Sequence, residues 1–138
     1  MSKKVHIKAA EGSNYLEFSH PTPSDTADCI EYFSVTLKVE TLEAAARVWA
    51  YTDARWLVTI FKQMEDNWRG WEGVKEWKTV EEEFSIQFAS DKKGHILVEV
   101  YLRPDYIVGG HWEVKGGFYL EAGQLPTMTR QITEFFSV

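Results

Sequence analysis

The chain has a single cysteine among its 138 residues, so it cannot form an internal disulfide. No apolar run is long enough to cross a bilayer, and no apolar stretch follows the basic start Lys3-Lys4 as it would in a signal peptide. We therefore expect a cytoplasmic protein with no membrane association. A hydrophobic content of 44% at this length indicates one domain over residues 1–138.

Motifs of catalysis and cofactor binding are missing as well. The sequence has no glycine-rich nucleotide fingerprint, phosphate loop, GxSxG elbow or HExxH zinc motif. His95 and His111 open successive antiparallel strands, which places them at opposite ends of a sheet, while His6 and His20 have no ligand residues nearby. We expect no catalytic residue, no metal and no cofactor, and hence a non-enzymatic protein.

Positive charge is scarce, because 15 Lys and Arg stand against 21 Asp and Glu and leave a net charge of −6. Binding to nucleic acid, which needs clustered Lys and Arg, is therefore not expected. Residues 65–83 hold seven acidic and three basic residues, so four of the six excess negative charges lie there. This stretch is either an ordinary solvated face or a surface that attracts a basic protein.

Alternating apolar residues predict strands before and after a central helix. A hairpin is expected around residues 11–14 and a strand over 33–39, while 43–51 is assigned to a strand although its three alanines also suit a helix. From Asp53 as N-cap, five apolar residues recur at helical spacing. They are Leu57, Ile60, Phe61, Met64 and Trp68.

Three further strands are expected after this helix, over residues 83–88, 96–102 and 112–120, and a second helix begins near Pro126. This order predicts an α+β fold with one antiparallel β-sheet of about six to seven strands and two helices packed on one face. The other face would be exposed. It would show Tyr32, Arg47, Trp49, Glu83, Glu99, Tyr101, Lys115 and Tyr119.

Aromatic and charged residues on that exposed face make it a candidate binding surface. Its proposed binding residues are Arg47, Trp49, Glu99, Tyr101 and Tyr119. Cross-strand pairing between good strand formers explains the same residues without any function. Both interpretations stay open at this point.

Three of the six tryptophans fall in residues 68–77, around Gly70 and Gly73. One interpretation is that Trp71 and Trp77 fold over the open end of the core. The other is that Trp71, Lys75 and Trp77 form a pocket for a ligand or an anchor for a partner protein. We name this stretch the tryptophan segment.

Three short motifs carry a resemblance to known proteins. They are Trp68-Arg69-Gly70-Trp71-Glu72-Gly73, then Asp91 with Gly94-His95, and Leu120-Glu121-Ala122-Gly123-Gln124-Leu125 before an aromatic-ended helix. Together they resemble a bacterial family of uncharacterised small proteins. The layout is also similar to that of WapI-type immunity proteins, with a similar Gly-His strand start and terminal helix. This resemblance implies a cytoplasmic, non-enzymatic protein that binds one cognate toxin.

Three functions thus remain as hypotheses. The first is a protein-binding domain with a basic partner such as a toxin. The second is a small-molecule binding or catalytic domain with its pocket under the tryptophan segment. The third is a subunit that self-associates through the exposed sheet face or an unpaired strand edge.

Overall fold

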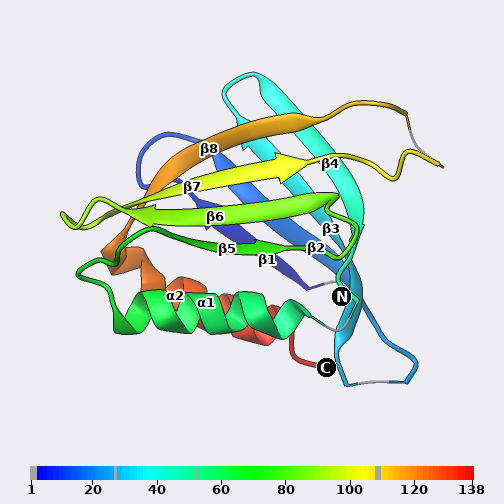
Figure 1. Cartoon of the computed structure of the whole chain (residues 1–138), viewed down its shortest axis with the longest axis horizontal. Coiled ribbons are helices and arrows are strands. Elements are labelled where there is room, and N and C mark those ends of the chain that lie inside the picture. The colour runs from blue at the N-terminus through cyan, green and yellow to red at the C-terminus, as the bar shows by residue number, and fades with distance from the viewer. Residues whose placement is uncertain (1–2, 27, 52, 108–109) are drawn as a thin grey trace.

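The computed structural model of the chain describes residues 3–26, 28–51, 53–107 and 110–138. Within these ranges eight strands form two antiparallel sheets, in the orders β1-β2-β3-β4 and β5-β6-β7-β8 (Figure 1). The strands are β1 Lys4–Lys8, β2 Tyr15–Pro23, β3 Ile30–Val39, β4 Leu42–Trp49, β5 Val74–Lys78, β6 Phe84–Ser90, β7 His95–Leu102 and β8 Val114–Glu121. The helices are α1 Ala54–Asp66 and α2 Leu125–Phe135, and a 3-10 turn, η1 Ala122–Gln124, precedes α2.

The predicted α+β fold with antiparallel pairing is confirmed, but the prediction of a single sheet is wrong. The first sheet ends with β4, and the chain then passes through α1 before the second sheet begins. The strand that opens the second sheet, β5, was missed because it lies inside the tryptophan segment. It pairs with β6, so the strands on either side of α1 belong to different sheets.

The prediction that both helices cover one face of a sheet is also wrong. The helices α1 and α2 pack side by side along the border of the molecule where β1 and β5 are the outermost strands (Figure 1). Elsewhere the sheets meet directly, since a β-carbon added to Gly116 in β8 would lie 3.2 Å from Cδ2 of Leu37 in β3. The inner faces of the two sheets therefore cover each other, and the helices fill the side that the sheets leave open.

Aromatic side chains from both sheets and from α2 form the centre of the core. The Phe33 ring lies 5.1 Å from that of Phe18 in the first sheet, 6.3 Å from that of Phe84 in the second and 6.1 Å from that of Phe135 in α2. The edge-to-face arrangement of these pairs is one that aromatic rings favour. Each such buried side chain contributes about 1.5–3 kcal/mol by leaving water, so this cluster holds the two sheets and α2 together.

The local predictions hold in most places. Residues 43–51 do contain a strand, β4, and Asp53 occupies the N-cap position of α1, although its side chain makes no capping hydrogen bond. The helix ends at Asp66, so Trp68 lies beyond it and not on its buried stripe. No helix in the part of the chain that the structure describes is both long and apolar enough to cross a membrane.

Candidate functional site

The predicted exposed face is divided between two surfaces. Arg47 and Trp49 lie on the outer face of the first sheet, because the inward positions of β4 belong to residues such as Val48. Glu99 and Tyr101 lie on the outer face of the second sheet, as does Tyr119 in β8. Since the sheets pack through their inner faces, these two groups point away from each other. The structure does not bring them together as one binding surface.

On the first sheet the candidate residues bond to neighbouring strands. The Arg47 guanidinium donates to the carbonyl oxygen of His20 at 2.6 Å, to Oγ of Ser34 at 3.1 Å and to the Thr22 hydroxyl. The Trp49 indole N–H donates to the Glu31 carboxylate at 3.1 Å. These contacts fix the irregular end of β2 against β3 and β4, which gives both residues a structural role.

Glu83 was placed on the exposed face, and this prediction is wrong. Its residue is 7% exposed. The carboxylate accepts a hydrogen bond from the backbone N–H of Trp49 at 3.3 Å and another from the Thr79 hydroxyl. Buried carboxylates need such donors, and here they join the end of β4 to the β5–β6 connection.

On the second sheet, Glu99, Lys115 and Gly117 line a shallow hollow of about 430 Å³. A β-carbon at Gly117 would lie 2.3 Å from the carbonyl oxygen of Val98, so this close approach requires glycine. The Tyr101 hydroxyl donates to the Glu113 carboxylate at 2.8 Å. That hydrogen bond raises the pKa of Tyr101 to about 12, so its hydroxyl stays protonated at neutral pH.

The tryptophan segment serves the core at its C-terminal end. Trp77 is 5% exposed and its ring lies 6.4 Å from Phe33 and 6.0 Å from Phe84. Trp71 is half-buried and its indole N–H donates to the carbonyl oxygen of Phe88 at 3.3 Å. Both side chains therefore pack against the body of the protein, as the first interpretation of the segment had it.

Lys75 bridges the segment to α1. Its Nζ lies 5.5 Å from the centre of the Trp71 ring and 3.4 Å from Oε1 of Gln63. A groove of about 400 Å³ between α1 and β5 has Lys75, Trp77 and Trp56 in its lining. Of the three candidates in the segment, Lys75 and Trp77 thus border a groove, although the Trp77 ring is largely enclosed.

Trp68, at the other end of the segment, lies in a different environment. It is 54% exposed and lines a cavity of about 610 Å³. Other residues of the lining are Glu65, Lys93, His95, Glu121 and Pro126. We call this the Trp68 cavity. Sequence reasoning missed it, because Trp68 matched the apolar spacing of the helix.

The Trp68 cavity is assembled from segments that are far apart in the sequence: the end of α1, the β6–β7 turn and the β8–α2 junction. A backbone hydrogen bond from Ala122 to Gly94, at 2.9 Å, ties the last two together. These same segments carry the three motifs of the resemblance. The three motifs of this sequence were therefore the available signal for this site.

His95 is held in place by Asp91 at the rim of the cavity. One carboxylate oxygen of Asp91 accepts the backbone N–H groups of Lys93 at 2.7 Å and His95 at 3.0 Å, and the other lies 2.8 Å from Nδ1 of His95. The backbone hydrogen bond from Lys93 is the largest of the effects that lower the pKa of Asp91. Because a carboxylate accepts, Nδ1 is the donor in this contact.

A second hollow of about 570 Å³ adjoins the first and shares His95 and Glu121 with it. Its lining adds Asn14, Asp91 and the predicted binding residue Tyr119. His95 and Glu121 are directly opposite each other on β7 and β8, so they form a common wall. Tyr119 is thus a candidate that the structure does bring to this site.

Negative charge predominates around these hollows. The first hollow has Glu65, Glu121 and Lys93 in its lining, while the second has Glu11, Asp91 and Glu121 and no lysine or arginine. The Trp68 ring already attracts a cation, since the Arg69 guanidinium lies 5.0 Å from its centre. Carboxylates beside an indole face suit an ammonium or guanidinium group. Among the described residues, no three His, Cys, Asp or Glu side chains gather as metal ligands.

Fold and site together define an α+β protein of two four-stranded antiparallel sheets and two helices, with an acidic, aromatic cavity at one end. The chain belongs to the family of unknown function DUF6228, which matches residues 7–138. The predicted membership of a family of uncharacterised proteins is thereby supported. Neither the curated proteins nor the solved structures contain a match to the chain.

Proposed function

We propose that this chain is a non-enzymatic protein-binding domain whose Trp68 cavity receives a basic side chain of the partner. The observation that carries the proposal is the exposure of Trp68, at 54%, within a hollow that also has Glu65 and Glu121 in its wall. Tryptophan is among the residues enriched at energetic hot spots of protein interfaces. A half-exposed indole in a hollow that two carboxylates also line suits a lysine or arginine anchor.

The physical basis is a combination of ring and carboxylate contacts. A cation over an indole contributes about 0.5–2 kcal/mol, and more as the site loses water. Glu65 and Glu121 line the same hollow and would accept hydrogen bonds from the charged group. The net charge of −6 would further raise the rate at which a basic partner approaches.

The identity of the partner as a bacterial toxin, neutralised in the cytoplasm, rests on the sequence resemblance to WapI-type immunity proteins. The acidic cavity is compatible with a basic toxin surface. We keep this as the finer form of the proposal.

A small-molecule binding domain is the second candidate. The Trp68 cavity, at about 610 Å³, has a size typical of small-ligand pockets. His95, oriented by Asp91 through the 2.8 Å contact, presents its imidazole at the rim. A cationic metabolite would use the same indole and carboxylates.

The test is affinity purification of the tagged full-length chain from lysate of its own source, with retained proteins and small molecules identified by mass spectrometry. Three forms are compared: wild type, Trp68→Ala and Trp56→Ala. Trp56 is the matched control because it is more exposed, at 63%, yet lies outside the Trp68 cavity. We expect a basic protein to be retained by wild type and Trp56→Ala and lost from Trp68→Ala.

Titration of the purified partner then measures the effect. Loss of the indole should weaken binding by roughly tenfold or more, the effect of removing a hot-spot residue. Equal affinity of the Trp68→Ala form would contradict the proposal. Retention of a small molecule, lost from Trp68→Ala, would support the second candidate in its place.

A further inference from the structure

The Trp68 cavity has a neighbour that the proposed function does not use. This second hollow, of about 570 Å³, has Tyr119 in its lining, and we call it the Tyr119 hollow. It shares His95 and Glu121 with the Trp68 cavity. These two residues lie directly opposite each other on β7 and β8, so the two hollows meet at a single cross-strand pair.

Each hollow has one large aromatic side chain that is open to solvent. Tyr119 is 55% exposed, which matches the 54% of Trp68. It occupies an outward position of β8, two residues before Glu121, so the side chains of Tyr119 and Glu121 share one face of the strand. The face of a tyrosine ring attracts a cation as that of tryptophan does. Both hollows therefore offer a ring to a positively charged group.

The glutamates that line the two hollows take part in no ion pair within the described residues. Every ion pair formed there uses other acids, as Glu72 pairs with Lys92. Glu11 lines the Tyr119 hollow, Glu65 lines the Trp68 cavity and Glu121 lines both. Each hollow thus has carboxylates that a cation from outside can pair with.

Backbone hydrogen bonds hold the Tyr119 hollow in shape. The N–H of Ala10, between β1 and β2, donates to the carbonyl oxygen of Tyr119 at 2.8 Å. The N–H of Asp91 donates to the carbonyl oxygen of His95 at 3.1 Å and closes the β6–β7 turn. A site that is ordered before it binds loses less conformational entropy on binding.

We propose that the Trp68 cavity and the Tyr119 hollow together bind two basic side chains from one extended segment of the partner protein. The inference rests on the proposed function, which places the first of these side chains in the Trp68 cavity. The second lies over the Tyr119 ring, with Glu11 and Glu121 as acceptors. Glu121 lines both hollows and so attracts both charges.

The arrangement of β8 indicates the spacing of the two basic residues in the partner. Tyr119 is two residues from Glu121, which corresponds to about 7 Å along an extended strand. Alternate residues of an extended peptide have the same separation, and their side chains point to the same side. A segment with the pattern Arg-x-Arg or Lys-x-Lys therefore suits the pair of hollows, whereas a segment with one basic residue fills only one of them.

The probes are labelled synthetic peptides, titrated into the full-length chain by fluorescence anisotropy. One peptide contains Arg-Ser-Arg within a sequence of Gly and Ser, and the other has Gln in place of one Arg. We expect the two-arginine peptide to bind wild type about fivefold more tightly, the contribution of one further cation held by a ring and carboxylates. Binding of neither peptide would overturn the inference.

A pair of tyrosine variants tests whether the Tyr119 hollow causes this difference. Tyr119→Ala should reduce the difference to about twofold or less and leave the affinity of the one-arginine peptide unchanged. Tyr32→Ala is the matched control, because Tyr32 is also an exposed strand tyrosine, at 40%, and lies outside both hollows. It should keep the full difference. A general attraction of basic peptides to a protein of net charge −6 would be equal in the two variants.

The same titrations separate this inference from the proposed function. Trp68→Ala should weaken both peptides, since each of them uses the Trp68 cavity. If it does so while Tyr119→Ala keeps the full difference between the peptides, the proposed function is supported and this inference is wrong. If Trp68→Ala weakens neither peptide, the proposed function is wrong as well.

NMR on the wild type gives a readout that needs no variant. The amide signal of Tyr119 should shift when the two-arginine peptide is added and much less with the one-arginine peptide. Equal shifts would contradict the inference. So would equal affinity for a linear diamine of the same span, because the hollows would then recognise two charges without a peptide segment.

Discussion

Trp77 and Trp68 stand at opposite ends of the tryptophan segment, yet one belongs to the core and the other to the surface. Trp77 is 5% exposed and packs between Phe33 and Phe84, whereas Trp68 is 54% exposed in an acidic cavity. The two side chains differ in burial because they lie on different parts of the backbone. Trp77 occupies an inward position of β5 opposite Ile86, and Trp68 follows the end of α1 at Asp66. Residue type alone therefore does not reveal which tryptophan holds the fold and which is available for binding.

The largest effect is expected from Trp77→Ala. Removing a buried tryptophan leaves a cavity and typically costs about 3–5 kcal/mol. The free energy of unfolding, measured with urea, should fall by that amount. Trp77→Phe is the control, since it keeps an aromatic ring beside Phe33 and removes an indole N–H that has no acceptor among the described residues. A loss below about 1 kcal/mol for the alanine form would show that Trp77 is not a core residue.

An intermediate effect is expected from Trp71→Phe. This change removes the hydrogen bond from the indole to the carbonyl oxygen of Phe88 and weakens the contact with Lys75. One such bond contributes about 0.5–1.5 kcal/mol. The urea midpoint should therefore lie between those of wild type and Trp77→Ala. A loss as large as that of Trp77→Ala would place Trp71 in the core.

A small effect on stability is expected from Trp68→Ala. A half-exposed side chain outside the core usually changes the free energy of unfolding by less than about 0.5 kcal/mol. The same variant should lose partner binding, so stability and binding separate at this residue. Strong destabilisation in urea would mean that Trp68 holds the end of α1 in place, and the comparison with Trp77 would fail.

The smallest effect on the free energy of unfolding is expected from protonation of Asp91, beside the Trp68 cavity. Hydrogen bonds from the Lys93 and His95 N–H groups lower the pKa of this carboxyl below its ordinary value of 3.8. Because the pKa of Asp91 is lower in the folded than in the unfolded protein, its carboxylate stabilises the fold at pH values above 3.8. This stabilisation is lost as the pH falls through the folded pKa. The urea midpoints of wild type and Asp91→Asn should thus converge as the solution is acidified below that value. A constant gap down to about pH 2 would show that the carboxylate charge is not what stabilises the turn.

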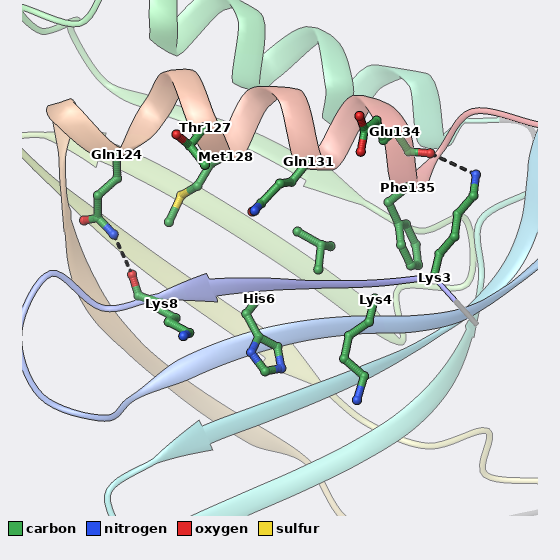
Figure 2. A pocket seen from close by; sticks show the side chains of 11 residues that line it. Lys3, Lys4, His6, Lys8, Gln124, Thr127, Met128, Gln131, Glu134 and Phe135 are labelled. Carbon is green, nitrogen blue, oxygen red and sulfur yellow. Dashed lines mark hydrogen bonds between the residues drawn. The ribbon is translucent and has the colours of Figure 1, made fainter. Parts of the chain in front are cut away.

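The same lesson applies to surfaces. The Trp68 cavity is lined by Glu65, Glu121 and Lys93, while a hollow of about 750 Å³ between β1 and α2 (Figure 2) is lined by Lys3, Lys4, Lys8 and Glu134. The acidic stretch of residues 65–83 has fewer free carboxylates than its composition indicates. Glu83 is buried, Glu72 binds Lys92, and Glu82 lies 3.5 Å from Lys78. Net charge thus says little about the charge of a particular site.

Local patterns predicted most of the elements. The period of two in β3, β6 and β7 and the helical spacing in α1 are properties of contiguous residues, so they can be read directly. The strand β5 was missed because it is short and follows two glycines in a segment that looked like a loop. The division into two sheets was missed because strand pairing is a long-range property.

The candidate site was only partly predictable. Arg47 and Trp49 were correctly placed on outward strand positions. Glu99 and Tyr101, however, belong to the second sheet and lie on a different side of the molecule. The Trp68 cavity depends on contacts such as that between Ala122 and Gly94, which lie far apart in the sequence. The spacing of apolar residues along the chain gives no information about such a contact.

The sequence by itself determined the composition of the core, the class of the fold and the family. It did so because apolar periodicity and turn residues act over a few neighbouring positions. The tertiary structure decided which tryptophan is buried, which sheet each aromatic faces and where opposite charges gather. These properties depend on which distant segments meet, and that is settled by the packing of two sheets and two helices around one aromatic core.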